Sequence, residues 1–488
     1  MQALLRALLV AITFPVFATT TAQAQSTNSF PIVFVHGFAG WGRDEALGLK
    51  YWGGIQGDLQ EQLKAQGYTV YTAAVGPFSS NWDRACELYA QIKGGTVDYG
   101  ENHAKTHGHK RLGRTFPGLF PQWGTVVNGQ VQKVHLVGHS MGGQTIRMLA
   151  QLLAKGSKGA PIEESASSHA LFAGGKDWVH SITTISTPNQ GTLLANGFSE
   201  IGDLVKNFAI GTLSTLGVLG DGVNVVYDAK LDQWGVEARR PGESLMAYIE
   251  RVFKSPIFKP GFRDISLWSL STDGAAEENR WVQTLPNVYY YSYATIDTYE
   301  WRDLLLRRVH KPHVLTMLLP MQPLGTFLGG RYGPNNGFSE SWQGNDGVVN
   351  TESMIKDATG QVVPFTGNSE RGKWNQMREL SRLDHLAVVG ITLHTQIKDL
   401  YVEHAKLLRS LPLTPKNAAA EDISIAASTT SVNDAIARLT SAAATVNSKE
   451  DLQKLCASPI NALAANYCAN MLKNAGSGAT RLLLRRRV

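Results

Sequence analysis

Residues 133–153 read KVHLVGHSMGGQTIRMLAQLL, an apolar run followed by a glycine-flanked serine and a pattern of helical period. The apolar run predicts a strand that is buried on both faces, and the residues after Gly142 predict a helix. A serine at such a sharp strand-to-helix turn exposes its hydroxyl above the sheet. Small residues at Gly138 and Gly142 let the backbone cross closely. The segment therefore predicts a nucleophilic serine, Ser140, on an α/β fold.

The chain from Phe30 to about Leu411 repeats this alternation of short apolar runs and helical patterns. The other clear runs are PIVFVHG (31–37), VHSITTIST (179–187) and NVYYYSYAT (287–295). Such alternation is typical of a mainly parallel sheet flanked by helices. In open α/β sheets the carboxyl ends of the strands carry the chemistry. We therefore predict the α/β-hydrolase fold, with the HGFAG and HSMGG segments at functional strand ends.

A serine nucleophile needs a histidine base that is oriented by a carboxylate, and this fold orders them as serine, acid, histidine. His385, in RLDHLAVVG, combines a late position, a polar approach and a short apolar run behind it. Asp346, in QGNDGVVNTESM, lies on a glycine-flanked turn upstream. Asp384 is adjacent to the histidine, so it is badly placed to hold the far ring nitrogen and is predicted to fix the loop. The predicted catalytic triad is Ser140, Asp346 and His385.

The HGFAG segment at 36–40 follows the first clear strand, as an oxyanion loop should. The backbone N–H groups of Phe38 and Met141 are expected to stabilise the negative charge of a tetrahedral intermediate. The start of the helix after Ser140 places further N–H dipoles near that charge. Together these segments predict acyl transfer from an ester through an acyl-enzyme.

Several unusual strings recur in the order found in a known family. They are HGFAGWGRDEALGLKYWGG (36–54), VGPFSSNWDRACELYAQIKGGTVDYG (75–100), HGHKRLGRTFPG (107–118), KLDQWG (230–235), RRPGES (239–244), NDGVVNT (345–351) and DHL (384–386). Over about residues 31–410 the chain resembles the secreted, zinc-containing thermoalkaliphilic lipases of Bacillus and Geobacillus. The resemblance implies a serine lipase that hydrolyses carboxylic esters, with triacylglycerols as the expected substrates.

The resemblance also implies a tetrahedral zinc ion held by two aspartates and two histidines. The pattern falls on Asp83 in NWDR, His103 in GENH, His109 in HGH and, across a two-residue insertion, Asp264 in FRDI. Four protein ligands leave no open coordination position, so the expected zinc is structural. Without the resemblance, the same residues would suit a polar surface loop with dispersed histidines.

The same family often binds calcium near the catalytic histidine, through a glutamate two residues beyond it and an Asp-Pro pair a little later. These positions are here Ala387 and Thr392-Leu393. A hard cation needs oxygen ligands, ideally charged ones. We therefore expect no calcium at this site.

The two ends of the chain differ from its centre. One arginine, an apolar run from Leu8 to Ala18 and an Ala-x-Ala step predict a signal peptide over residues 1–24 and a secreted or periplasmic protein. Residues 25–411 form the predicted hydrolase domain. Residues 412–488 read as an Ala/Ser/Thr-rich linker and a small helical appendage. Its two cysteines, Cys456 and Cys468, can form a disulfide in an exported chain. Cys86 is predicted to be a buried free thiol.

Residues 195–226 mix apolar and polar residues with several glycines. One interpretation is a buried helix pair. The other is a helical lid whose apolar face covers the site until a lipid surface draws it open.

The composition narrows the range of partners. A net charge of +6 and a pI near 9.0 permit attraction to anionic lipid or envelope surfaces. The sequence contains no stripe of basic and aromatic residues, so nucleic-acid binding is not expected. After the leader, no run of about twenty apolar residues predicts a transmembrane segment. The expected partner is a lipid or ester at an interface. The alternatives are a carboxylesterase or polyester depolymerase and, from another class, a non-catalytic surface-binding protein, which the intact Ser, Asp and His disfavour.

Overall fold

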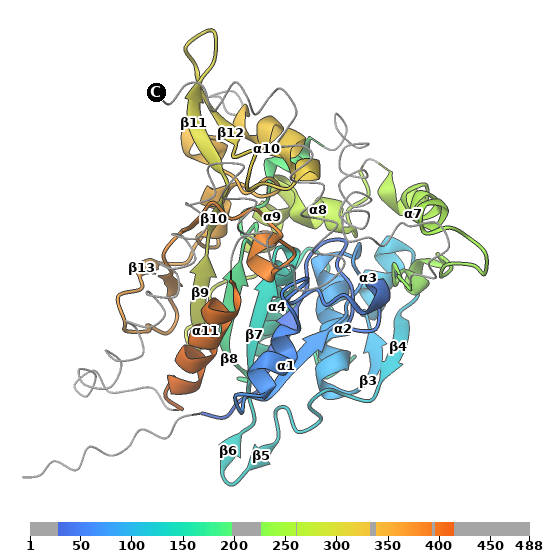
Figure 1. The fold of residues 1–488 in the computed structure, drawn as a ribbon. Helices are drawn as coiled ribbons and strands as arrows, with labels where there is room; N and C mark the ends of the chain where they lie inside the picture. Colours follow the sequence, from blue (N-terminus) through green and yellow to red (C-terminus); the bar gives the residue numbers. More distant parts are fainter. Residues whose placement is uncertain (1–27, 198–225, 260, 332–337, 393–395, 414–488) are drawn as a thin grey trace, which may run out of the picture.

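A computed structural model describes residues 28–197, 226–259, 261–331, 338–392 and 396–413 (Figure 1). The predicted signal peptide and the predicted appendage with Cys456 and Cys468 lie outside the described residues. So does nearly all of the predicted lid segment.

A seven-stranded sheet forms the centre of the molecule, and all its pairings are parallel. The four predicted strands are confirmed within a few residues as β1, β7, β8 and β9. In spatial order the sheet consists of β13 (Val362–Pro364), β14 (Trp374–Gln376), β9 (Tyr289–Tyr293), β8 (Val179–Ile185), β7 (Val134–His139), β1 (Ile32–Val35) and β2 (Val70–Ala73).

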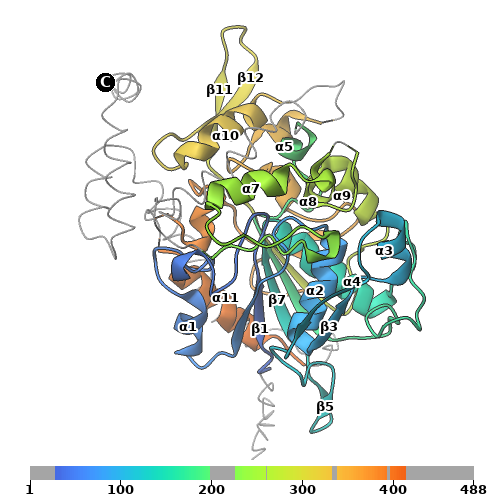
Figure 2. The same ribbon diagram turned by 90° about the vertical axis from the view of Figure 1, so that its right-hand side faces the viewer.

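Helices cover both faces of this sheet (Figures 1 and 2). Because successive strand residues point to opposite faces, Val33 and Val35 join one core cluster while Ile32 and Phe34 join the other. The first cluster includes α2 (Asn81–Lys93) and α4 (Met141–Lys155), and the second includes α1 (Leu59–Lys64) and α11 (Lys398–Ser410). Double-sided burial explains why the strands are apolar without alternation.

Smaller elements gather beyond the carboxyl ends of the strands (Figures 1 and 2). They are α5 (Leu193–Asn196), α7 (Leu245–Phe253), α8 (Ser266–Leu270), α9 (Thr272–Asn279), α10 (Gln322–Gly329) and the hairpin of β11 (Thr298–Arg302) and β12 (Arg308–Pro312). At the β2 side of the molecule, α3 (Glu101–His107) connects β3 (Gly95–Asp98) to β4 (Leu112–Phe116). Short pairs complete the sheet content: β5 (Val126–Val127) with β6 (Gln130–Val131), and β10 (Thr295–Ile296) with β15 (Leu380–Ser381).

One further expectation, the buried thiol, is met by the described residues. Cys86 is a buried free thiol on α2. None of the described helices combines the length and the apolar character needed to cross a bilayer.

Candidate active site and metal centre

Ser140 sits in the turn between β7 and α4 with φ 55° and ψ −133°. A positive φ is unfavourable for a residue with a side chain, so the surrounding packing must hold this conformation. A Cβ atom at Gly142 would lie 2.2 Å from the Val35 carbonyl oxygen, and one at Gly138 would lie 2.4 Å from the Gly142 backbone. Both positions therefore require glycine, and the close backbone crossing expected from the sequence is present.

His385 and Asp346 are joined directly. The distance from His385 Nδ1 to Asp346 Oδ2 is 2.8 Å, and both side chains are buried. Asp346 Oδ1 accepts hydrogen bonds from the backbone N–H groups of Val348 and Val349, and Oδ2 also accepts one from the Thr295 hydroxyl. Each carboxylate oxygen of Asp346 therefore accepts two hydrogen bonds, so the orientation of the carboxylate is fixed. A carboxylate held in this way keeps the ring proton on Nδ1 and leaves Nε2 free to act as a base.

Asp384 points elsewhere. Its Oδ1 accepts from the N–H groups of Leu386 and Ala387, and its Oδ2 accepts from the N–H of Leu318. Burial raises the pKa of the Asp384 carboxyl to about 6. The side chain therefore ties the histidine loop to the segment before α10, as expected for a loop-fixing residue.

This contrast predicts different outcomes for two conservative substitutions. Asp384→Asn places an amide N–H₂ against either the Leu318 N–H or the two loop N–H groups, so it should lower the melting temperature. Its loss of kcat should stay at least about tenfold smaller than that of Asp346→Asn, because the His385 partner is intact. Thermal unfolding and ester hydrolysis measured on both variants test this. A larger kcat loss in Asp384→Asn would assign the orienting acid to Asp384.

Ser140 and His385 open into one apolar pocket. No Ser140–His385 hydrogen bond is formed among the described residues, a common state for catalytic pairs without substrate. The pocket is lined by Phe38, Ala39, Trp41, Tyr51, Ser140, Thr192, Leu194, Ala195, Leu267, Leu270, Val348, Val349, His385 and Leu386. An acyl chain is the kind of group that such a lining accommodates.

The two expected oxyanion donors are available near this serine. Met141 is the first residue of α4, so its N–H has no partner inside the helix. The Phe38 N–H donates to no other described residue, whereas the Ala39 N–H donates to the Pro77 carbonyl. A Cβ atom on Gly37 would lie 2.6 Å from Ser140 Cβ, which shows how closely the loop approaches Ser140.

A buried chain of hydrogen bonds links the HGFAG loop to the loop that carries His385. His139 Nε2 lies 2.8 Å from the His385 carbonyl oxygen, which can only accept, so Nε2 carries the proton. His139 Nδ1 then accepts from the Tyr51 hydroxyl at 2.6 Å, and the Tyr51 oxygen accepts from the Gly37 N–H. Burial holds the pKa of His139 well below its usual value, so the neutral form is retained.

The fully buried guanidinium of Arg84 supports the HGFAG loop through hydrogen bonds. Arg84 donates from Nη2 to the His36 carbonyl, from Nη1 to the Gly76 carbonyl and from Nε to the Thr145 hydroxyl. Burial lowers the pKa of Arg84 to about 10, which leaves it charged at neutral pH. Arg84 thus connects the carboxyl ends of β1 and β2 to α4.

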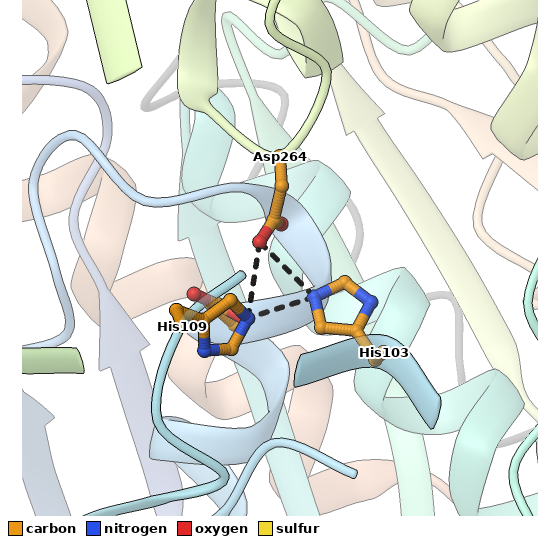
Figure 3. A group of neighbouring side chains, drawn as sticks. His103, His109 and Asp264 are labelled. Carbon is orange, nitrogen blue, oxygen red and sulfur yellow. Dashed lines mark ion pairs between the residues drawn. The ribbon is translucent and has the colours of Figure 1, made fainter. Parts of the chain in front are cut away.

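The four predicted metal ligands converge at a second site. Asp83 comes from α2, His103 from α3, His109 from the segment after α3, and Asp264 from the turn before α8. One ligand atom from each lies within 4.8 Å of all the others. Figure 3 shows Asp264, His103 and His109 pointing toward one another. Gly108, with φ 81°, ends α3 in a left-handed turn that brings His109 back toward His103.

The geometry of this group fits a tetrahedral ion. His103 Nε2 lies 3.3 Å from Asp83 Oδ1 and 3.2 Å from Asp264 Oδ2, and His109 Nε2 lies 4.0 and 3.3 Å from the same two oxygens. Ligands about 2.0 Å from a tetrahedral zinc are separated by about 3.3 Å. Asp83 Oδ1, Asp264 Oδ2 and both Nε2 atoms are buried, and none forms a hydrogen bond among the described residues. Buried polar atoms rarely lack partners, so the group can bind a metal ion such as zinc.

Outer contacts orient these ligands. His109 Nδ1 lies 2.8 Å from the Lys110 carbonyl oxygen, which fixes the proton on Nδ1 and frees Nε2. Gln233 donates to the other carboxylate oxygen of Asp83. The His103 ring stacks on Trp82, with centroids 4.9 Å apart. Outer contacts that orient the ligands in this way are typical of metal sites in proteins.

The positions where the resembling family has its calcium ligands do not form a comparable group of ligands among the described residues. Ala387 is buried in a 3₁₀ turn (Ala387–Val389), and the Thr392 carbonyl accepts from Gln56. Neither supplies a carboxylate.

Asp297 is a buried carboxylate near Asp384, and one of its oxygens accepts a hydrogen bond from the Thr316 hydroxyl. Burial, with the nearby Asp384 charge, holds the pKa of Asp297 well above its usual value.

Comparison with known proteins identifies the family. The family described as "Lipase-like, C-terminal domain" matches residues 28–409. The chain belongs to this family. The sheet and its flanking helices are the α/β-hydrolase fold of this lipase-like family, as the sequence predicted.

Three relatives illustrate the relationship to this lipase-like family. Lipase 2 of Staphylococcus aureus is 36% identical over 383 residues, which cover 76% of this chain and 51% of the relative. The structure of lipase 1 from Pelosinus fermentans matches with a TM-score of 0.69 at 47% identity, covering 79% of this chain and 99% of that one. Staphylococcus hyicus lipase matches with a TM-score of 0.62 at 33% identity, covering 79% and 97%. The chain spans about half the length of the curated relatives it matches.

Four supporting residues were not singled out from the sequence: Tyr51, Arg84, His139 and Thr295. Tyr51 and Arg84 lie within the strings that carry the family resemblance, and His139 is the variable residue of the G-x-S-x-G turn. Thr295 ends the apolar run 287–295, which predicts a strand but no contact with a carboxylate.

Proposed function

We propose that the protein is a secreted serine lipase that hydrolyses carboxylic esters, with triacylglycerols as the main substrates. The proposal rests on one observation above all: His385, which is paired with Asp346, lines the same apolar pocket as Ser140 in its strained turn. Family membership adds to it, as the named relatives are lipases.

In the proposed mechanism, Ser140 Oγ attacks the ester carbonyl carbon while His385 Nε2 accepts the hydroxyl proton. The tetrahedral oxyanion binds the N–H groups of Phe38 and Met141. His385 then donates its proton to the leaving alcohol oxygen, which leaves an acyl group on Ser140. A water molecule, deprotonated by His385, attacks this acyl-enzyme, and the carboxylic acid leaves as Ser140 regains its proton. Asp346 stabilises the imidazolium that forms in both halves.

Reaction with a serine-directed phosphonate tests this function. We expect one phosphonyl group on Ser140, located by peptide mass spectrometry, and loss of ester hydrolysis in proportion to labelling. Rates against an ester chain-length series, with and without an emulsion, should favour long acyl chains at an interface. A preference for short dissolved esters would indicate a carboxylesterase, and release of oligomers from a polyester film a depolymerase. Absence of labelling with full binding to lipid surfaces would indicate a non-catalytic protein.

We also propose that the chain shares the structural zinc of the Bacillus and Geobacillus lipases that it resembles. Asp83, His103, His109 and Asp264 would hold the ion, and their two carboxylates would balance its charge. The ion would supply a cross-link between α2, the α3 segment and the turn before α8 rather than chemistry on the substrate. We further propose residues 1–24 as an export signal, 25–411 as the hydrolase domain, 195–226 as a lid and 412–488 as an appendage.

A further inference from the structure

The hairpin of β11 and β12 ends in three exposed leucines. The exposed fractions of Leu304, Leu305 and Leu306 are 102%, 72% and 72%. Figures 1 and 2 show the hairpin projecting beyond the other labelled elements. Scattered exposed leucines are common on soluble proteins, but three in a row at a projecting tip are not. Such a run indicates an interaction surface.

Hydrogen bonds hold these leucines outward. The Asp303 carboxylate accepts from the N–H groups of Leu305 and Arg307, and its side chain pairs with that of Arg307 at 2.8 Å. The backbone N–H of Asp303 donates to the Arg307 carbonyl. Below the tip, five residue pairs from Thr298↔Pro312 to Arg302↔Arg308 keep an antiparallel register. The leucines are therefore presented by an ordered turn.

Aromatic and basic side chains surround the base of the tip. Residues 298–312 contain four basic and two acidic side chains. Trp301 is 40% exposed, and the Lys311 ammonium lies 4.6 Å from its ring centroid. The Arg302 guanidinium bonds to the Leu306 carbonyl and pairs with no carboxylate among the described residues. Apolar tips bordered by tryptophan and basic residues are typical of lipid–water interfaces.

The base of this hairpin is attached to the candidate active site. The Asp297 N–H and the Thr298 hydroxyl both donate to the Asn345 carbonyl, one residue before Asp346. Helix α10 packs against β12 and also against α5, whose Leu194 and Ala195 line the pocket. The hairpin and the pocket therefore both lie beyond the carboxyl ends of the strands, and a surface bound by the hairpin tip would face that side of the molecule.

We propose that the β11–β12 tip, residues 301–307, anchors the protein to a lipid–water interface that carries negative charge. Leu304, Leu305 and Leu306 enter the acyl-chain layer, while Arg302 and Trp301 remain at the headgroup level. The choice of a lipid as the surface that the tip binds rests on the proposed lipase function. Binding itself needs no catalysis, so the two are tested separately.

The test measures binding of the full-length protein carrying Ser140→Ala, so that hydrolysis does not alter the lipid. Cosedimentation is measured with vesicles of phosphatidylcholine alone and of phosphatidylcholine with phosphatidylglycerol. We expect the combined Leu304→Ser, Leu305→Ser and Leu306→Ser substitution to weaken binding at least about tenfold. Arg302→Gln should weaken binding only to the anionic vesicles, and added salt should do the same. Brominated lipid should quench tryptophan fluorescence less in a Trp301→Phe variant.

Matched controls come from exposed apolar residues elsewhere. Leu112 on β4 and Val126 on β5 are 57% and 66% exposed, and serine at both should leave binding unchanged. In the enzyme with Ser140 intact, the triple variant should keep its rate on a dissolved short ester and lose rate on an emulsion. Unchanged vesicle binding of the triple variant would overturn the proposal. So would conversion of a dimer to a monomer by the triple substitution, which would make the tip a contact between copies of the chain.

Discussion

Replacing Ser140 or His385 with alanine is expected to lower kcat for ester hydrolysis by roughly 10⁶-fold while the protein remains folded. Ser140 supplies the nucleophile that forms the proposed acyl-enzyme, and His385 supplies the base that activates it. The two losses should not add in a double variant, because each residue is useless without the other. Hydrolysis of a chromogenic ester and circular dichroism of each variant are the measurements. Turnover near the parent rate in either variant would reject the triad.

Asp346→Asn distinguishes an orienting carboxylate from a merely buried one. The N–H groups of Val348 and Val349 already donate to Oδ1, so the amide oxygen must stay there and the N–H₂ group must face His385. His385 Nδ1 would then have to accept, which moves the ring proton to Nε2 and removes the base. We expect a loss in kcat of roughly 10⁴-fold with little change in KM.

The central fold was predictable because its signals are local. Apolar runs over β1, β7, β8 and β9 reflect double-sided burial, and the glycines around Ser140 reflect a backbone crossing that tolerates no Cβ. Both constraints act on residues that are near in sequence. A single chain is therefore enough to read them.

The support of the site was not predictable, because its contacts join distant segments. Tyr51 meets His139, Thr295 meets Asp346, and Arg84 meets the His36 carbonyl, and none of these pairs has a characteristic spacing. The metal group shows the same limit. Its four ligands come from segments up to 181 positions apart, from Asp83 to Asp264, so only the family resemblance selected them before the structure brought them together.

Removing the metal from the proposed zinc site should lower the melting temperature by roughly 5–10 °C. The ion binds ligands that are assembled only in the folded chain, so binding stabilises that state. Without it, Asp83 and Asp264 leave two buried carboxylates next to each other. Initial ester hydrolysis at room temperature should fall far less, because none of the four ligands lines the pocket that holds Ser140. Metal analysis of the purified protein should give about one zinc ion per chain.

His103→Ala should reproduce the effect of the chelator and make the melting temperature insensitive to further chelation. His107→Ala is the matched control. His107 is on the same helix with its ring centroid 4.6 Å from that of His103, but it is not in the four-residue group. The control variant should keep its zinc and its response to chelation. Equal zinc loss in both variants would show that general loosening of α3, and not the loss of a ligand, explains the result.

Restoring single ions to the stripped protein decides which metal the chain retains. Zinc should return the parent melting temperature, while calcium should not, because Ala387 and the Thr392-Leu393 pair supply no carboxylate to a hard cation. The melting temperature is the proper measurement, since calcium can also accelerate lipid assays by precipitating released fatty acids as soaps. Recovery with calcium would instead indicate a site built on Asp297 and Asp384, which are buried carboxylates near the histidine loop but do not pair with His385. Zinc recovery in the parent and its absence in His103→Ala would assign the ion to the group of Asp83, His103, His109 and Asp264.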